Sequence, residues 1–299
     1  MKLICKRRGF TIIELLTVMS IIVILISLLV PSLNAVRRYS RVVRQKGQFH
    51  NIGTGLEMFS IDFDGYPDSS ENASKGIAPP EGAPYCGAMK LCEAMLGRDG
   101  LGFHPRSRFV ADGLDENGVD LYPEPPPGGL SDPTYAANIR ERKHTYIDAD
   151  KYQKVSLEDL CGVDPGRITP FTEPNAVICD VFQRVHGEIS RKKIGMPVLY
   201  YKADTSKLEH DPNTVVIPPG TACTNIYDYR DNYLLLGLHE VGMAILDHPM
   251  YTDLKLFYKN TWNRKSIIPR PYNEGTYILM SAGWDGLYGT KDDVYNFSE

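Results

Sequence analysis

Glu14 is the first residue of this sequence whose type and position indicate chemistry. It is the sole charged residue from Phe10 to Val36, where most side chains are Ile, Leu, Val or Met. A carboxylate near the middle of a membrane costs roughly 2.5–3.5 kcal/mol, and less near a helix end. An acid in such a stretch therefore marks a function by default.

A second candidate site lies near the end of the chain, where the sequence is SAGWDGLYGTKDDV from Ser281 to Val294. The glycines allow a tight backbone, so Asp285 could meet Asp292 and Asp293 around one hard cation. Calcium takes about six to eight oxygen ligands, so carbonyl groups and water would complete the shell. The alternative is a solvated Gly/Asp hairpin without an ion, and the residues alone leave both interpretations open.

The element that positions Glu14 is a membrane-spanning helix. A helix rises about 1.5 Å per residue, so Phe10–Val30 spans about one hydrocarbon core. A secretory signal peptide has a shorter apolar core, of about 7–15 residues. A plain signal anchor explains the whole stretch except Glu14. The start of the chain should stay in the cytoplasm because basic residues precede the helix. These are Lys2, Lys6, Arg7 and Arg8.

The segment GFTIIE, from Gly9 to Glu14, resembles the processing site of type IV prepilins and type II secretion pseudopilins. In that family a short basic leader is cut after the Gly by a prepilin peptidase, and the exposed Phe amine is then methylated. The resemblance implies cleavage after Gly9 and methylation at Phe10. Glu14 would then be fifth and Pro31 twenty-second in the mature chain, where the family carries those residue types.

The resemblance also implies a role for Glu14. In the family this carboxylate pairs with the Phe amine of a neighbouring subunit as the helices pack into a filament. Cleavage would create a cationic amine at Phe10, at the positive end of the helix dipole, and methylation would leave that charge in place. Glu14 is therefore expected to be an assembly residue. The alternative is that its side chain extends to the nearby membrane surface.

The helix is expected to continue as an amphipathic segment and to end at the sequence DGYP, residues 64–67. Its apolar stripe has spacings of three and four and should pack on a globular head. The stripe consists of Phe49, Ile52, Leu56, Phe59 and Phe63. The predicted parts are a leader (1–9), a transmembrane half-helix (10–36), an amphipathic half-helix (37–63) and an extracytoplasmic head (64–299), with an insertion at 67–190.

The head is predicted to be α+β and pilin-like, with an antiparallel β-sheet packed on the long helix. Ten of the 21 prolines lie in residues 67–133, which predicts loops and short helices there. A short helix is expected within 81–96. Strands are predicted at Ala176–Val181, Val198–Tyr201, Tyr233–Leu238 and Tyr277–Ser281.

The cysteines leave their pairing open. Cys5 would be lost with the leader, and disulfides are permitted outside the cytoplasm. Five cysteines remain, an odd number, so at least one thiol stays free or pairs between chains. They are Cys86, Cys92, Cys161, Cys179 and Cys223.

No enzymatic activity is expected. The sequence contains no G-x-S-x-G segment and no Walker-type phosphate loop, and Met243 stands where a second zinc-binding His would have to follow His239. The formal net charge is −4, and it becomes −8 when residues 1–9 and their four basic charges are removed. This mildly acidic balance argues against a nucleic acid partner.

The C-terminal segment resembles the calcium loop of the major type II pseudopilin. Both have the same order of Asp-Gly, Gly-Thr and Asp-Asp, although Trp284 stands where that family usually has Pro. The resemblance therefore implies calcium as a cofactor, held by Asp285, Asp292 and Asp293.

The resulting prediction is a protein that first crosses the cytoplasmic membrane once. The protein is then extracted from the membrane and becomes a subunit of a type II secretion pseudopilus or a type IV pilus. It would support protein secretion or a surface filament. The implied partners are other pilin or pseudopilin subunits, the prepilin peptidase, the inner-membrane assembly platform and membrane lipid. The alternative is a membrane-anchored extracytoplasmic binding protein whose insertion recognises a glycan, a surface or a secreted cargo.

Overall fold

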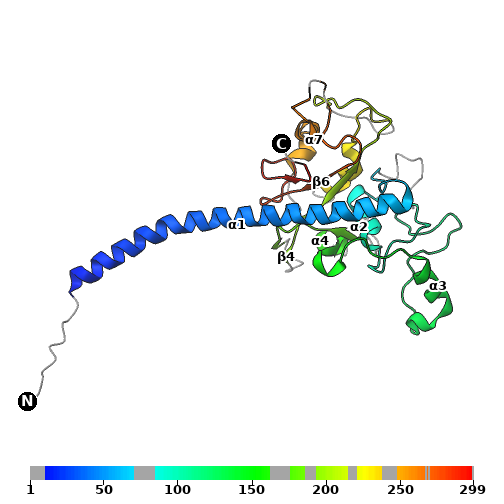
Figure 1. Cartoon of the computed structure of the whole chain (residues 1–299), viewed down its shortest axis with the longest axis horizontal. Coiled ribbons are helices and arrows are strands. Elements are labelled where there is room, and N and C mark those ends of the chain that lie inside the picture. The colour runs from blue at the N-terminus through cyan, green and yellow to red at the C-terminus, as the bar shows by residue number, and fades with distance from the viewer. Residues whose placement is uncertain are drawn as a thin grey trace, which may run out of the picture. The chain divides into compact units, whose positions relative to one another are not determined.

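The computed structural model describes residues 11–70, 85–161, 176–185, 193–214, 221–237, 248–266, 268 and 270–297, apart from the side chains of 158 and 161. The chain divides into two compact units, Met1–Val43 and Arg44–Glu299. The longest element, α1 (Ile12–Phe63), contributes to both units (Figure 1).

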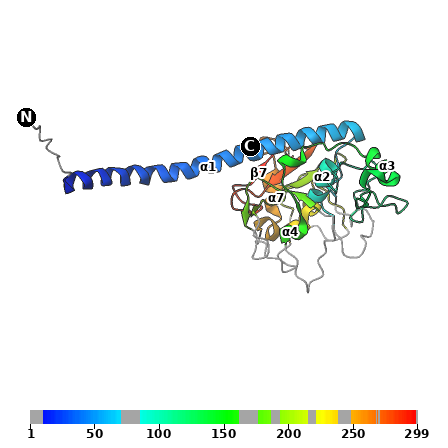
Figure 2. The ribbon, with the colours of Figure 1, turned by 90° about the horizontal axis from the view of Figure 1, so that it is seen from below.

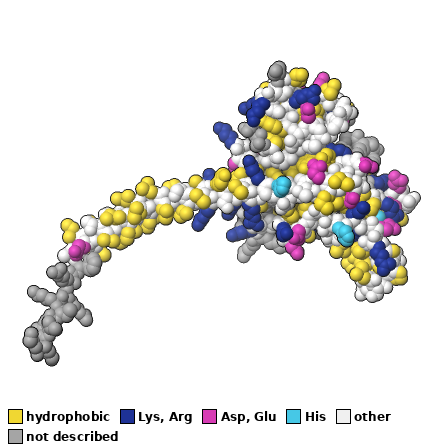
Figure 3. All heavy atoms as spheres, viewed as in Figure 1, with side chains coloured by type: hydrophobic (Ala, Val, Ile, Leu, Met, Phe, Trp, Pro, Cys, Tyr) yellow, Lys and Arg dark blue, Asp and Glu magenta, His cyan; other side chains and the backbone are white. Residues whose placement is uncertain are grey.

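The part of α1 in the first unit exposes apolar side chains on all sides. Every residue from 11 to 41 is exposed, and Figure 3 shows hydrophobic side chains along this part of the helix. Pro31 lies inside α1, and the helix continues beyond it. Among the described residues, α1 is the one helix long and apolar enough to cross a membrane. A helix that is apolar all round needs lipid or protein around it rather than water.

The part of α1 in the second unit carries the predicted apolar stripe on its buried face. Phe49, Ile52, Leu56 and Phe59 are each at most 3% exposed, and the ring of Phe63 lies 4.6 Å from that of Phe59. This confirms the stripe. The helix ends at the predicted turn, because Asp64 takes a left-handed backbone conformation (φ 53°) that α-helices do not contain.

Helix α2 (Gly87–Leu96) is buried along its whole length, including its charged residues Lys90 and Glu93. It packs against strands β2 (Ala176–Ile178) and β5 (Leu199–Lys202). Both ribbon views place α2 beside the second half of α1 (Figures 1 and 2). The predicted short helix is confirmed for its described part.

Within the described residues, the strands form three small antiparallel sheets. The largest has the order β5-β6-β7, with β6 at Tyr277–Ser281 and β7 at Val294–Tyr295. Its register pairs Tyr200 with Leu279. The other two sheets pair β1 (Lys154–Ser156) with β2, and β3 (Arg184–Val185) with β4 (Lys193–Ile194). A long helix followed by antiparallel strands confirms the α+β pilin-like fold.

One predicted strand is wrong. Residues Tyr233–Leu236 form the helix α5, whose Leu235 and Leu236 are buried in the core. A short apolar run has no periodicity that separates a strand from a buried helix, and leucine favours helix. The preceding 3-10 turn η4 (Tyr229–Asn232) already bends the chain helically, because the Asp228 side chain accepts a hydrogen bond from the amide of Arg230.

The remaining elements are short helices between loops. They are η2 (Gly129–Ser131), α3 (Pro133–Glu141), η3 (Ala149–Lys151), α4 (Leu157–Cys161), α6 (Pro249–Thr252) and α7 (Lys255–Thr261). Within the described part of 67–133 there are helices and turns and no strand, as the prolines predict.

The core of the second unit is rich in tyrosine. A buried phenol needs a hydrogen-bond partner, and main-chain carbonyls supply it for Tyr200 and Tyr227. The hydroxyl of Tyr200 donates to the carbonyl oxygen of Pro67 at 2.7 Å, and that of Tyr227 donates to Asn273 at 2.5 Å. The first bond ties β5 to the segment that follows α1, and the second joins two loops of the head.

Candidate functional site

The start of α1 contains a reciprocal hydrogen-bond arrangement between Thr11 and Glu14. The amide and the hydroxyl of Thr11 both donate to Oε2 of Glu14 at 2.8 Å. The amide of Glu14 donates back to Oγ1 of Thr11 at 3.3 Å. Thr11 and Glu14 therefore form a capping box, the T-x-x-E pattern that satisfies the first amides of a helix.

The capping box determines the surroundings of Glu14 within one chain. Its side chain is exposed, and within the described residues no hydrogen bond reaches its Oε1 atom. Among the described residues, the carboxylate is thus held from one side by Thr11, and none of them donates to its second oxygen. Gly9 and Phe10, the predicted processing residues, lie outside the described residues.

The three acidic residues of the C-terminal segment are held mainly by donors of the same loop. Oδ2 of Asp292 accepts from the amide of Asp285 at 2.9 Å, and its Oδ1 accepts from the Thr290 hydroxyl at 2.6 Å. These bonds keep the pKa of Asp292 low although burial alone would raise it. Oδ1 of Asp285 accepts from the amide of Leu287 at 2.8 Å. Burial raises the pKa of Asp285, and the neighbouring Asp292 adds to that effect.

Asp293 is the most deeply placed of the three carboxyl groups. Its Oδ2 atom accepts from the amide of Gly289 at 2.8 Å and from the Tyr295 hydroxyl at 3.2 Å, while its Oδ1 atom is buried with no hydrogen-bond partner. Burial raises the pKa of Asp293 to about 8.

A side-chain cation reaches the same loop from β3. The guanidinium of Arg184 donates to the main-chain carbonyl oxygens of Trp284 and Asp285. Among the described residues, no group of three or more His, Cys, Asp or Glu side chains is arranged to hold a metal ion. The described residues of the loop therefore do not fit a calcium site, and calcium binding there stays a prediction.

Four of the five cysteines predicted to remain after processing are described as buried thiols rather than as disulfides. They are Cys86, Cys92, Cys179 and Cys223. Burial raises the pKa of Cys92 to about 12, which keeps this thiol protonated and chemically quiet. The side chain of Cys161 lies outside the described residues.

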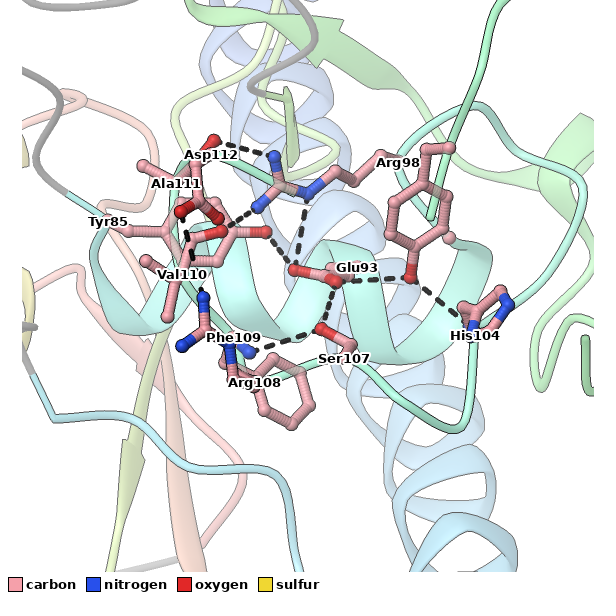
Figure 4. A network of polar contacts seen from close by, with 12 residues as sticks. Tyr85, Glu93, Arg98, His104, Ser107, Arg108, Phe109, Val110, Ala111 and Asp112 are labelled. Atoms are coloured by element: carbon pink, nitrogen blue, oxygen red, sulfur yellow. Dashed lines mark hydrogen bonds and ion pairs between the residues drawn. The ribbon is translucent and has the colours of Figure 1, made fainter. Parts of the chain in front are cut away.

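A buried polar cluster in the insertion was not predicted. Oε1 of Glu93 accepts from the hydroxyls of Ser107 (2.5 Å) and Tyr122 (3.0 Å), and the Tyr85 hydroxyl donates to Oε2. Arg98 forms an ion pair with Oε2 at 3.5 Å (Figure 4). The carboxylate is enclosed and satisfied, so the cluster fastens the segment that contains Ser107 and Tyr122 to α2 within the insertion. Its one signal in the sequence is an acid in an otherwise mostly apolar helix.

The comparisons with known proteins concern the N-terminal region. Residues 4–30 match the family described as "Prokaryotic N-terminal methylation motif". Type II secretion system core protein G of Pseudomonas aeruginosa is 30% identical over 79 residues, which cover 26% of this chain and 56% of that protein. Prepilin peptidase-dependent protein D of Escherichia coli K12 is 30% identical over 95 residues, which cover 32% of this chain and 64% of that protein.

The chain thus spans between 56% and 64% of the length of these two relatives. No solved structure matches it. The matched motif contains Thr11 and Glu14 and continues along the apolar part of α1, so the resemblance seen in the sequence is confirmed. The N-terminal segment of the chain therefore carries the prokaryotic N-terminal methylation motif and is similar to that of a type II secretion core protein and of a prepilin peptidase-dependent protein.

Proposed function

We propose that this protein is a prepilin-like subunit that is cut after Gly9, methylated at Phe10 and assembled through α1 into a type II secretion pseudopilus or a type IV pilus. One observation carries the proposal. The first part of α1 is apolar with no buried residue, lies in a methylation motif, and bears a single acid, Glu14, near its start.

Before assembly, membrane lipid would cover this part of α1. The basic residues of the leader would keep the N-terminus in the cytoplasm and place the head outside it. The prepilin peptidase and an inner-membrane assembly platform are the partners at this stage. In the filament, other copies of α1 or related helices would replace the lipid, through close packing rather than a water-driven force.

The capping box suggests which donors the Glu14 carboxylate would have in the separate subunit and in the filament. In the separate subunit, Thr11 holds Oε2 of the carboxylate. In the filament, the methylated amine of Phe10 from a neighbouring subunit would donate to the Oε1 atom. Pairing compensates a charge that is costly in an apolar surrounding, so the ion pair favours the assembled state.

We propose a mechanical role and no enzymatic activity for the head. Glu93, its most connected buried carboxylate, is enclosed by Tyr85, Ser107 and Tyr122 and cannot reach a substrate. The work of the protein would come from assembly of its helices.

A second candidate is a membrane-anchored extracytoplasmic binding protein. Apolar side chains of the insertion favour it, because Leu101 is 52% exposed and Leu130 is 69% exposed. Exposed apolar side chains in one insertion are typical of contact surfaces. The head of a filament subunit would also offer these exposed apolar side chains as a contact surface.

Intact-mass measurement of the membrane-extracted protein tests the proposal. A chain that starts at methylated Phe10 is expected for the subunit of a filament. Gly9→Val serves as the control, since it should leave an uncut chain. A wild-type protein that keeps Met1 and remains unassembled would instead support the membrane-anchored binding protein.

A further inference from the structure

We infer that Arg184 is the built-in cation of the C-terminal loop, residues 283–293, and takes the place that the sequence resemblance gives to calcium. The inference concerns the head alone and does not depend on the proposed assembly function.

The first support is the geometry of the guanidinium. Nη2 of Arg184 donates to the carbonyl oxygen of Trp284, and Nη1 donates to that of Asp285. Two successive carbonyls thus point at one cation, as main-chain ligands do around calcium. An arginine carries a permanent charge, and its planar fork suits two neighbouring acceptors.

The second support is the shape of the loop backbone. Gly286 has a positive φ of 70°, and a Cβ atom at this position would collide with the Arg184 guanidinium. Gly283 has a φ of 63°, and a Cβ atom there would collide with the carbonyl group of Asp292. The lack of a side chain at Gly286 therefore leaves space for the Arg184 guanidinium. The lack of one at Gly283 lets the backbone at the start of the loop contact the backbone of Asp292 at its end.

The third support is that the carboxylates of Asp285 and Asp292 already accept hydrogen bonds within the loop. Asp292 accepts from the Asp285 amide and from Thr290, and Asp285 accepts from the Leu287 amide. The described residues contain no arrangement of acidic side chains that could hold a metal ion. Arg184 brings its positive charge to the main-chain carbonyls of Trp284 and Asp285, beside these carboxylates.

The segment that carries Arg184 also holds the start of the loop. Oδ2 of Asp180 accepts from the hydroxyl of Ser281 at 2.7 Å, and the amide of Gly283 donates to the same hydroxyl oxygen at 3.3 Å. Asp180 and Arg184 therefore hold Ser281, just before the loop, and the first residues of the loop, Trp284 and Asp285. The loop should keep its conformation without calcium and lose it without Arg184.

Thermal unfolding of the full chain in detergent micelles tests this inference, with either excess calcium chloride or EGTA present. The wild-type Tm should be the same in both. Arg184→Gln should lower the Tm by about 2–4 °C, equally in both conditions, if the contact contributes about 1 kcal/mol. Lys193→Gln, which removes one exposed positive charge from the neighbouring strand β4, is the matched control and should leave the Tm unchanged.

Fluorescence of Trp284 reports on the loop itself. The chain has two tryptophans, Trp262 and Trp284, so Trp262→Phe leaves a single probe, which is 38% exposed in the closed loop. Arg184→Gln should shift its emission to longer wavelength, and Arg184→Lys, which cannot form the two-pronged contact, should shift it less.

Two results would overturn the inference. One is a wild-type Tm or Trp284 emission that changes with calcium. The other is an Arg184→Gln variant that behaves like Lys193→Gln. Should Arg184→Gln fail to fold, the wild-type comparison with and without calcium and the Arg184→Lys variant still decide.

Discussion

Oε2 of Glu14 accepts two hydrogen bonds from Thr11, one from its amide and one from its hydroxyl, each at 2.8 Å. The acid of the methylation motif therefore has a local task, the capping of its own helix, beside its proposed task in assembly. These two tasks require different properties of the side chain. Capping needs a hydrogen-bond acceptor, whereas pairing with a neighbour's amine needs a negative charge.

Glu14→Gln should separate the two tasks. Glutamine also serves as the third helical residue of a capping box, so the helix start should survive, while the pair with a cationic amine is lost. We expect normal processing, seen by intact mass, with strongly reduced filaments in sheared fractions. Glu14→Ala should lose both tasks and serves as the comparison. Normal filament levels in Glu14→Gln would show that the charge has no role in assembly.

Thr11→Val tests the other partner of the box. Valine has nearly the same shape as threonine but no hydroxyl, so Oε2 of Glu14 loses one donor and the amide of Glu14 loses its acceptor. Hydrogen exchange in micelles should be faster for the amides of the first turn of α1. Thr11→Ser keeps the hydroxyl and should match the wild type. Equal exchange rates in all three proteins would contradict the role of the capping box.

The N-terminal motif and the long helix could be predicted because their information is local. Thr11 to Glu14, the apolar stretch after them and the turn at Asp64 lie within one helix and its ends, and Tyr277–Ser281 is a strand with the predicted bounds. The capping box was also present as T-x-x-E from Thr11 to Glu14. It was missed because the membrane explanation of Glu14 did not consider helix capping.

The features that could not be predicted depend on contacts between distant residues. Arg184 meets Trp284 across a separation of 100 residues, and nothing near Arg184 in the sequence indicates this contact. Likewise, the partners of Glu93 on Ser107 and Tyr122 follow from how the insertion folds back on α2. The helix α5 formed where a strand was predicted because packing, and not periodicity, decides a short apolar run.

Asp293 should make the stability of the head fall as pH rises. Its pKa in the folded state is about 8, above the ordinary value of 3.8, so the folded protein binds the proton more tightly than the unfolded chain. The stabilising effect is full below the unfolded value and is lost as the pH rises toward the folded value. Asp180, whose pKa burial raises to about 6, acts in the same direction over the lower part of this range.

Asp293→Asn should therefore flatten the decline of Tm between about pH 5 and about pH 8. Thermal unfolding across this range, at constant ionic strength, measures the effect. Asp253→Asn changes an exposed carboxylate outside the C-terminal loop and should keep the wild-type decline. A decline in Asp293→Asn as steep as that of the wild type would mean that Asp293 is not the group that titrates.

Glu93 should be the most sensitive position of the insertion. Its removal in Glu93→Ala would leave Arg98, which is 5% exposed, without its carboxylate partner at 3.5 Å. Loss of one member of a buried ion pair typically costs about 3–5 kcal/mol. Denaturant unfolding of the full chain in micelles should show a loss of this size, and limited proteolysis should cut first between Tyr85 and Tyr122.

Glu116→Ala is the matched control, because Glu116 is exposed in the same insertion and should change the free energy of unfolding by no more than about 0.5 kcal/mol. Glu93→Gln keeps the shape and part of the hydrogen bonding to Ser107 and Tyr122, so its loss should lie between the two. If Glu93→Ala were as stable as Glu116→Ala, the cluster would not be what fastens the segment that contains Ser107 and Tyr122 to α2.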